Sequence, residues 1–93
     1  MPYGEHELKT LPNYWDAVAR GEKTFEVRRD DRGFQKGDVV TLVKYDPDKG
    51  YCKDKHGKSM EISRTITYVL TGGQFGIEAG YVVLGLGEMK PHT

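Results

Sequence analysis

The sequence has 93 residues, a length that suits one domain, because a division would leave each part without an adequate core. It contains 14 basic and 14 acidic residues, and the formal net charge of zero excludes a general attraction to nucleic acid or to anionic membranes. No stretch reaches the roughly 20 apolar residues of a membrane span, and the charged first residues lack the pattern of a signal peptide. We therefore expect a single domain over residues 1–93, located in the cytoplasm and without a membrane partner.

Cysteine use agrees with a reducing compartment. The one cysteine, Cys52, cannot form an intramolecular disulfide. Cys52 and His56 are four residues apart, but no second pair of ligands stands near them in the sequence. We therefore predict no metal site and no cofactor.

The chain begins with a predicted strand, His6 to Thr10, followed by a predicted helix, Pro12 to Arg20. The last residue of the strand can cap the helix, proline suits its first turn, and Gly21 supplies the left-handed residue that often ends a helix. Trp15 falls on the apolar stripe of the helix and is predicted to lie in the core. Tyr14, beside that stripe, could lie in the core or stack on a ligand.

A second strand is predicted from Lys23 to Arg29, where apolar and charged residues alternate. Phe25 and Val27 occupy one face of this strand, and Glu26 and Arg28 occupy the other. The alternation predicts that the two apolar side chains face the core and that the charged pair projects from the opposite face.

The rest of the chain reads as strands separated by one long loop. The predicted strands are Val39 to Tyr45, Glu61 to Leu70 and Tyr81 to Leu86. The first of these is rich in β-branched residues and should be central in the sheet. Asp46 to Lys58 is predicted to be a mobile, lysine-rich loop, and Met89 to Thr93 a frayed tail. The fold class is therefore α+β, mostly β: a small barrel of five or six strands with one helix after the first strand.

Three features outside the second strand have two interpretations each. Lysines flank Tyr51 in the predicted loop, a pattern that suits the phosphates and bases of a single strand or, alternatively, a solvated hairpin. His6 could carry protons in a cleft or lie at the surface. Tyr68 is predicted to be core, although its hydroxyl could reach a cleft.

The densest charge cluster includes Lys23, Glu26 and Arg28. A carboxylate can accept from an exocyclic amine, a guanidinium can donate two parallel hydrogen bonds to a carbonyl or phosphate, and an ammonium acts as a point charge. This chemistry suits recognition of a base or a phosphate. Alternatively, Glu26 and Arg28 pair with each other on a solvated strand face.

The run GEKTFEVR, Gly21 to Arg28, resembles the G-x-K-x-x-E-x-R signature of the ASCH family in the PUA-like superfamily. Residues 6–86 are similar throughout to a small phage and bacterial ASCH-like family. The resemblance implies a five- or six-stranded barrel with a polar cleft, in a superfamily whose members mostly bind RNA or modified bases. Carried over by position, the cleft signature falls on Lys23, Glu26 and Arg28. The smaller family's further recurrent positions fall on His6, Lys9, Asp31 and Arg32.

The function expected from this resemblance is binding of RNA or of a normal or modified nucleoside. An alternative is a small hydrolase of amidohydrolase or ribonuclease type, in which Lys23 and Glu26 act as catalytic acid and base. The sequence departs from the amidohydrolase pattern, because Glu26 occupies the position of its threonine. A further alternative is a phage-type module that binds a protein partner through the lysine-rich loop. Whether the protein is an enzyme, and its oligomeric state, stay open.

Overall fold

The computed structural model describes residues 3–88, so the predicted tail lies outside the described residues. The elements are β1 (Glu5–Thr10), α1 (Pro12–Ala19), β2 (Phe25–Arg29), β3 (Val39–Asp46), β4 (Gly50–Tyr51), β5 (Glu61–Thr71) and β6 (Tyr81–Gly87). The mostly-β composition with one helix after the first strand confirms the predicted fold class. The five predicted strands and the helix are all present, with ends shifted by at most two residues.

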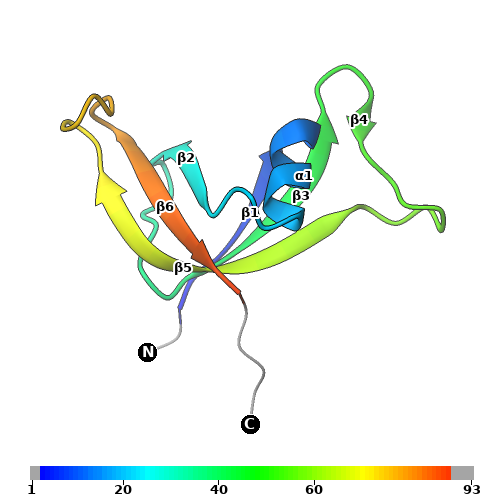
Figure 1. Cartoon of the computed structure of the whole chain (residues 1–93), viewed down its shortest axis with the longest axis horizontal. Helices are drawn as coiled ribbons and strands as arrows, with labels where there is room; N and C mark the ends of the chain where they lie inside the picture. Colours follow the sequence, from blue (N-terminus) through cyan, green and yellow to red (C-terminus); the bar gives the residue numbers. More distant parts are fainter. Residues whose placement is uncertain (1–2, 89–93) are drawn as a thin grey trace, which may run out of the picture.

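The main sheet has the strand order β1-β3-β5-β6-β2. The short strand β4 lies outside this order and pairs with β3. β1 and β3 run parallel, whereas the other neighbours are antiparallel. The sheet curls into a half-barrel (Figure 1). Its middle strand is β5; β3 and then β1 lie on one side of β5, and β6 and then β2 lie on the other. β3 lies between β1 and β5, which confirms its predicted central place. β1 and β2 are the two edges of the curled sheet.

The helix lies on β3, and its limits follow the expected signals with one exception. Pro12 is its first residue, and Gly21 has a φ of 82°, the left-handed conformation that glycine adopts without steric cost. The cap prediction was wrong, because the capping residue is Leu11, which makes no side-chain hydrogen bond to the helix. The hydroxyl of Thr10 instead donates to the carbonyl of Leu8, at 3.2 Å.

The core fills the concave side of the sheet beneath the helix. Its buried members are Leu8, Val18, Phe34, Val40, Leu42, Ile66, Val82 and Leu84. Trp15 packs against this cluster, and its indole N–H donates to the carbonyl of Leu42 at 2.9 Å, which confirms its place at the core.

In the part of the chain that the structure describes, no helix is long and apolar enough to cross a membrane.

The facing of β2 is the reverse of the prediction. Glu26 is 4% exposed, whereas Phe25 is 45% exposed. Glu26 lies opposite Leu84, a core residue, in the β2–β6 ladder, and directly paired residues share a face of the sheet. Two cations neutralise the Glu26 carboxylate, and this pairing lets the charged face turn inward.

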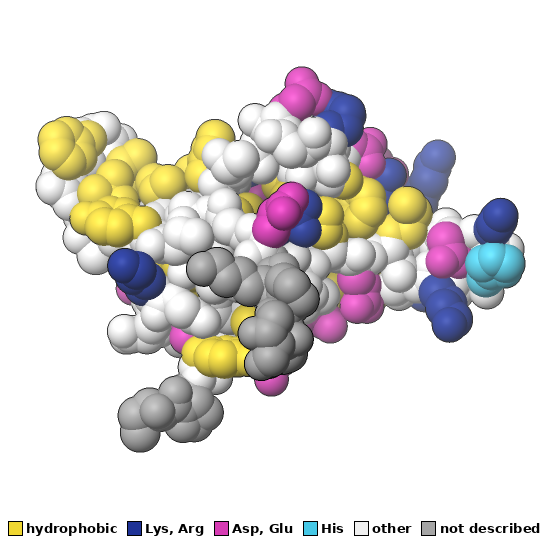
Figure 2. Space-filling view, turned by 60° about the horizontal axis from the view of Figure 1, so that its bottom comes forward, with side chains coloured by type: hydrophobic (Ala, Val, Ile, Leu, Met, Phe, Trp, Pro, Cys, Tyr) yellow, Lys and Arg dark blue, Asp and Glu magenta, His cyan; other side chains and the backbone are white. Residues whose placement is uncertain are grey.

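Tyr68 is 62% exposed, so the prediction that it belongs to the core was wrong. The register of β5 against β6 shifts between Ile66 and Tyr68. This irregularity breaks the period-two pattern and turns Tyr68 to the face opposite the buried Ile66. Figure 2 shows hydrophobic side chains gathered at the surface toward one end of the molecule, where β5 and β6 meet in a turn.

The lysine-rich segment is more regular than predicted. It contains β4, which pairs with the end of β3, and a second turn closed by a bridge between Lys53 and Ser59. Both turns are stabilised by aspartate: Asp46 accepts hydrogen bonds from two backbone N–H groups of the first turn, and Asp54 does the same in the second.

Candidate functional site

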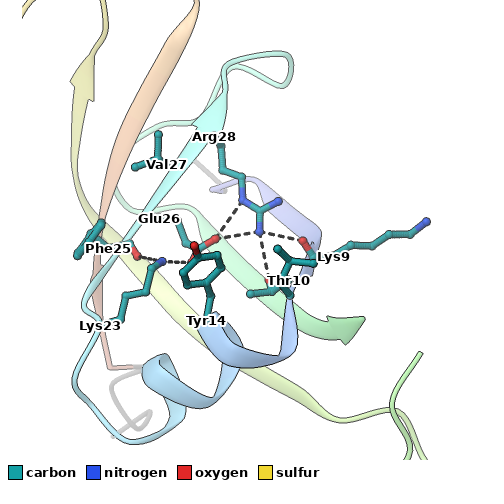
Figure 3. Close-up of a pocket in the computed structure, with 9 residues that line it drawn as sticks. Lys9, Thr10, Tyr14, Lys23, Phe25, Glu26, Val27 and Arg28 are labelled. Atoms are coloured by element: carbon teal, nitrogen blue, oxygen red, sulfur yellow. Dashed lines mark hydrogen bonds and ion pairs between the residues drawn. The ribbon is translucent and has the colours of Figure 1, made fainter. Parts of the chain in front are cut away.

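A cavity of about 420 Å³ lies between the two edges of the sheet and the start of the helix. Its lining comprises Lys9, Thr10, Leu11, Tyr14, Lys23, Phe25, Glu26, Val27 and Arg28. Figure 3 shows its labelled residues around one space, and they come from β1, from α1, from β2 and from Lys23 just before β2. The volume falls within the range of small-molecule sites, about 300–1,000 Å³.

The carboxylate of Glu26 is the centre of the polar wall. Lys23 Nζ lies 2.5 Å from Glu26 Oε2, and Arg28 donates to Oε1 from Nη2 at 2.8 Å and from Nε at 3.1 Å. Both carboxylate oxygens are therefore occupied by cationic donors. A carboxylate this deeply buried would be costly without such partners.

The cluster of Lys23, Glu26 and Arg28 carries a net positive charge, since two cations surround one carboxylate. The side chains of Lys23 and Arg28 are 17% and 24% exposed, whereas that of Glu26 is 5% exposed. Glu26 therefore positions two cations whose outer surfaces face the cavity. This arrangement suits an anionic group or a carbonyl oxygen on a ligand.

Arg28 also connects the two edges of the sheet. Its Nη2 donates to the carbonyl of Lys9 at 2.9 Å and to the hydroxyl of Thr10 at 3.1 Å, both on β1. Arg32 makes a similar contact further along the same edge, where its Nη1 donates to the carbonyl of Glu7 at 2.7 Å. The two guanidinium groups satisfy backbone carbonyls that no neighbouring strand covers, and they hold the half-barrel at its open side.

Two aromatic rings beside Lys23 also line the cavity. Tyr14 and Phe25 are 48% and 45% exposed, and Lys23 Nζ lies 5.5 Å and 4.8 Å from their ring centroids. Exposed Leu11 adds apolar surface beside Tyr14. A flat ring could therefore lie against an aromatic face while its polar edge reaches the two cations.

Comparison with known proteins places the chain in a family. A family model described as a domain of unknown function, DUF3850, matches residues 5–86. The chain belongs to the DUF3850 family. None of the curated proteins matches the sequence. The matched segment of the DUF3850 domain includes all nine residues that line the cavity.

Four of the seven predicted site residues of this DUF3850 protein share the cavity: Lys9, Lys23, Glu26 and Arg28. The other three lie elsewhere. His6 and Arg32 border a separate surface hollow near the N-terminal end of β1. The carboxylate of Asp31 is exposed and its Oδ1 lies 3.7 Å from Arg32 Nε.

His6 has a structural environment in the DUF3850 fold. Its Nε2 lies 2.9 Å from Asp38 Oδ2, and its ring packs edge-on against Phe34 with centroids 4.7 Å apart. Asp38 also accepts from the backbone N–H groups of Gly4 and Gln35, at 2.8 and 3.0 Å. Burial acts to raise the pKa of Asp38, but the hydrogen bonds from His6 and the two backbone groups, with the charge of His6, lower it overall.

Sequence reasoning missed Thr10, Leu11, Phe25 and Val27 as cavity residues of the DUF3850 domain. Phe25 and Val27 were not predicted to line a cavity, because the alternation in β2 assigned their side chains to the core. Thr10 gave no signal beyond its position at a helix start. In the described part of the chain, no group of three or more His, Cys, Asp or Glu side chains could hold a metal ion.

Proposed function

We propose that the cavity binds one nucleotide unit of RNA, or a free normal or modified nucleoside. The observation that carries the proposal is the presence, around one cavity, of two aromatic rings, Tyr14 and Phe25, beside a buried carboxylate that holds two cations. A nucleotide combines the two complementary features, since it has a flat ring with polar edges and an anionic phosphate.

The proposal gives each of these side chains a role. Base stacking falls to Tyr14 and Phe25. Lys23 and Arg28 bind a phosphate or a base carbonyl, and Glu26 holds these cations in place rather than pairing with an exocyclic amine, because both of its oxygens are already occupied. The zero net charge gives little electrostatic attraction at long range, so we expect modest affinity.

The resemblance of residues 21–28 to the ASCH signature supports the same proposal, as does the mostly-β half-barrel with its helix after the first strand. We accordingly propose that this DUF3850 chain is an ASCH-type, PUA-like domain. A cytoplasmic location would fit an RNA or nucleoside ligand.

The proposal is tested with Tyr14→Ala, a change that leaves the buried ion pairs intact. Loss of one stacking ring is expected to weaken binding of nucleoside monophosphates and short RNA about tenfold, as measured by calorimetric titration. Tyr68→Ala is the matched control, because it removes another exposed tyrosine, one that does not line the cavity. Equal affinities for both variants and the unmodified protein would reject the cavity as the binding site.

A second candidate is a hydrolase that acts on a modified nucleoside or on RNA. The favouring observation is the ion pair of Lys23 with Glu26 in the cavity wall, which places a candidate acid and a candidate base side by side. Mass spectrometry of nucleosides and oligonucleotides after incubation would show a new product, and Glu26→Gln would abolish it. Unchanged substrates across a broad panel at high protein concentration would reject this candidate.

A further inference from the structure

A second basic and aromatic cluster lies where β1 ends and β3 continues into its hairpin with β4. We call it the tyrosine ribbon; its members are Lys9, Tyr45, Tyr51 and Lys53. The two tyrosines are cross-strand partners, and their rings meet edge to face with centroids 5.1 Å apart. Lys9 Nζ lies 4.6 Å from the Tyr45 centroid and 5.7 Å from that of Tyr51, and Lys53 Nζ lies 5.9 Å from the Tyr51 centroid.

The lysines of the ribbon are not neutralised by carboxylates. Among the described residues, neither Lys9 nor Lys53 takes part in an ion pair. The nearby aspartates Asp46 and Asp54 use carboxylate oxygens to accept backbone hydrogen bonds within their turns. The ribbon therefore presents positive charge next to aromatic rings, although the protein as a whole is neutral.

Lys9 joins the ribbon to the cavity. Its carbonyl accepts the hydrogen bond from Arg28 within the cavity wall, while its side chain extends away from that space, as Figure 3 shows, toward the tyrosines. The cavity and the ribbon are thus two neighbouring parts of one surface, connected across the end of β1.

We propose that the tyrosine ribbon binds the nucleotides that flank the one held in the cavity, so that the ligand is single-stranded RNA rather than a free nucleoside. This inference rests on the proposed function of the cavity. Tyr51 is 42% exposed and supplies a face for one base, with the Tyr45 ring beside it. Lys9 and Lys53 bind the phosphates on either side.

The cation contacts with the rings do not oppose this binding. An exposed contact between a lysine and a tyrosine ring contributes less free energy than stacking of a base on that ring. A base can therefore displace one lysine from the ring, and the released ammonium then meets the phosphate of the same strand. Duplex RNA cannot use the rings, because its bases are already stacked and paired.

The test compares ligand lengths on one protein. Affinities are measured by calorimetric titration for nucleoside monophosphates and for mixed-sequence single strands of roughly two to eight nucleotides. The unmodified protein is expected to bind the longer strands at least tenfold more tightly than the monophosphates. The double variant Tyr51→Ala/Lys53→Ala should lose about tenfold in affinity for the strands and keep its affinity for the monophosphates.

Two further variants serve as controls. Tyr51→Phe keeps the ring and should retain the affinity for the strands. Tyr68→Ala/Lys36→Ala removes one exposed tyrosine and one exposed lysine away from the ribbon, and should bind every ligand like the unmodified protein.

Each failure has a distinct meaning. If the monophosphates bind but affinity does not rise with length, or rises equally in the ribbon variant, the ribbon is overturned and the cavity stands. If neither the monophosphates nor the strands bind, the proposed function itself fails, and the ribbon fails with it.

Discussion

Arg28 donates from one guanidinium nitrogen to the carboxylate of Glu26 on its own strand and to the carbonyl of Lys9 on the opposite edge of the sheet, at 2.8 and 2.9 Å. One side chain therefore anchors the polar wall of the cavity and fixes the distance between the edges that frame it. The site and the closure of the half-barrel depend on the same group.

Replacement of Glu26 by glutamine should destabilise the protein by about 2–3 kcal/mol, because two adjacent cations lose the charge that compensates them. This is less than for a fully buried pair, since Lys23 and Arg28 keep some contact with water. Urea unfolding followed by circular dichroism measures the effect. Glu22→Gln is the control: its pair with Arg20 is exposed, and its loss should cause no measurable change.

Arg28→Lys keeps the charge but loses the planar group that reaches Glu26, Lys9 and Thr10 together. We expect a loss of about 1–2 kcal/mol in unfolding free energy and about tenfold weaker nucleotide binding. Arg29→Lys, at an exposed position on the other face of β2, should change neither quantity. Full retention of binding by Arg28→Lys would show that nucleotide binding does not need the planar guanidinium group.

Asp38 should make the protein sensitive to acid. Its pKa in the folded state lies below the usual 3.8, so the unfolded chain takes up a proton more readily than the folded one as the pH falls. The stabilisation is complete above about pH 5 and is lost as the pH falls through 3.8 and then through the lower folded value. Asp38→Asn should be less stable than the unmodified protein at pH 7.

The difference in unfolding free energy between Asp38→Asn and the unmodified protein should shrink as the pH falls from about 5 to about 3. Urea titrations at several pH values measure it. Asp48→Asn changes an exposed turn residue and should keep the acid sensitivity of the unmodified protein. A constant difference across this range would contradict the role given to the Asp38 carboxylate.

Phe75 occupies a costly backbone conformation at the tip of the turn between β5 and β6. Its φ is 53°, its ring is 82% exposed, and the following Gly76 also has a positive φ. Asparagine tolerates this conformation better, so Phe75→Asn should raise the unfolding free energy by about 0.5–1 kcal/mol. Phe75→Ala, which removes the ring but keeps the strain, should leave it unchanged; a large loss there would mean that the ring makes stabilising contacts.

Local patterns were sufficient to locate the helix and every strand except β4. Alternation located β2, the β-branched run located β3, and Gly21 marked the helix end within about one residue. These signals are local, since each depends on neighbours a few positions away along the chain.

Which side of β2 faces inward could not be read from that strand alone. Glu26 is buried in a space made by β1 and the helix, where Lys23 and Arg28 neutralise it. These two cations are close to Glu26 in the sequence, but Arg28 is held by Lys9 and Thr10 of β1, which are 19 and 18 residues away from it. Tyr68 escaped prediction for a related reason: a single irregularity in β5 changed which face it occupies. His6 and Asp38, 32 residues apart in the sequence, likewise meet only through the fold.

The most direct measurement of the central claim is a backbone NMR titration of the protein with nucleoside monophosphates and a short single-stranded RNA. Binding in the cavity predicts that the amide signals of residues 9–14 and 23–28 shift with both ligands, and that those of residues 45–53 shift with the RNA alone. A spectrum in which these signals stay still at saturating ligand, or in which shifts gather around residues 72–81 instead, would contradict the assignment of the cavity as a nucleotide site.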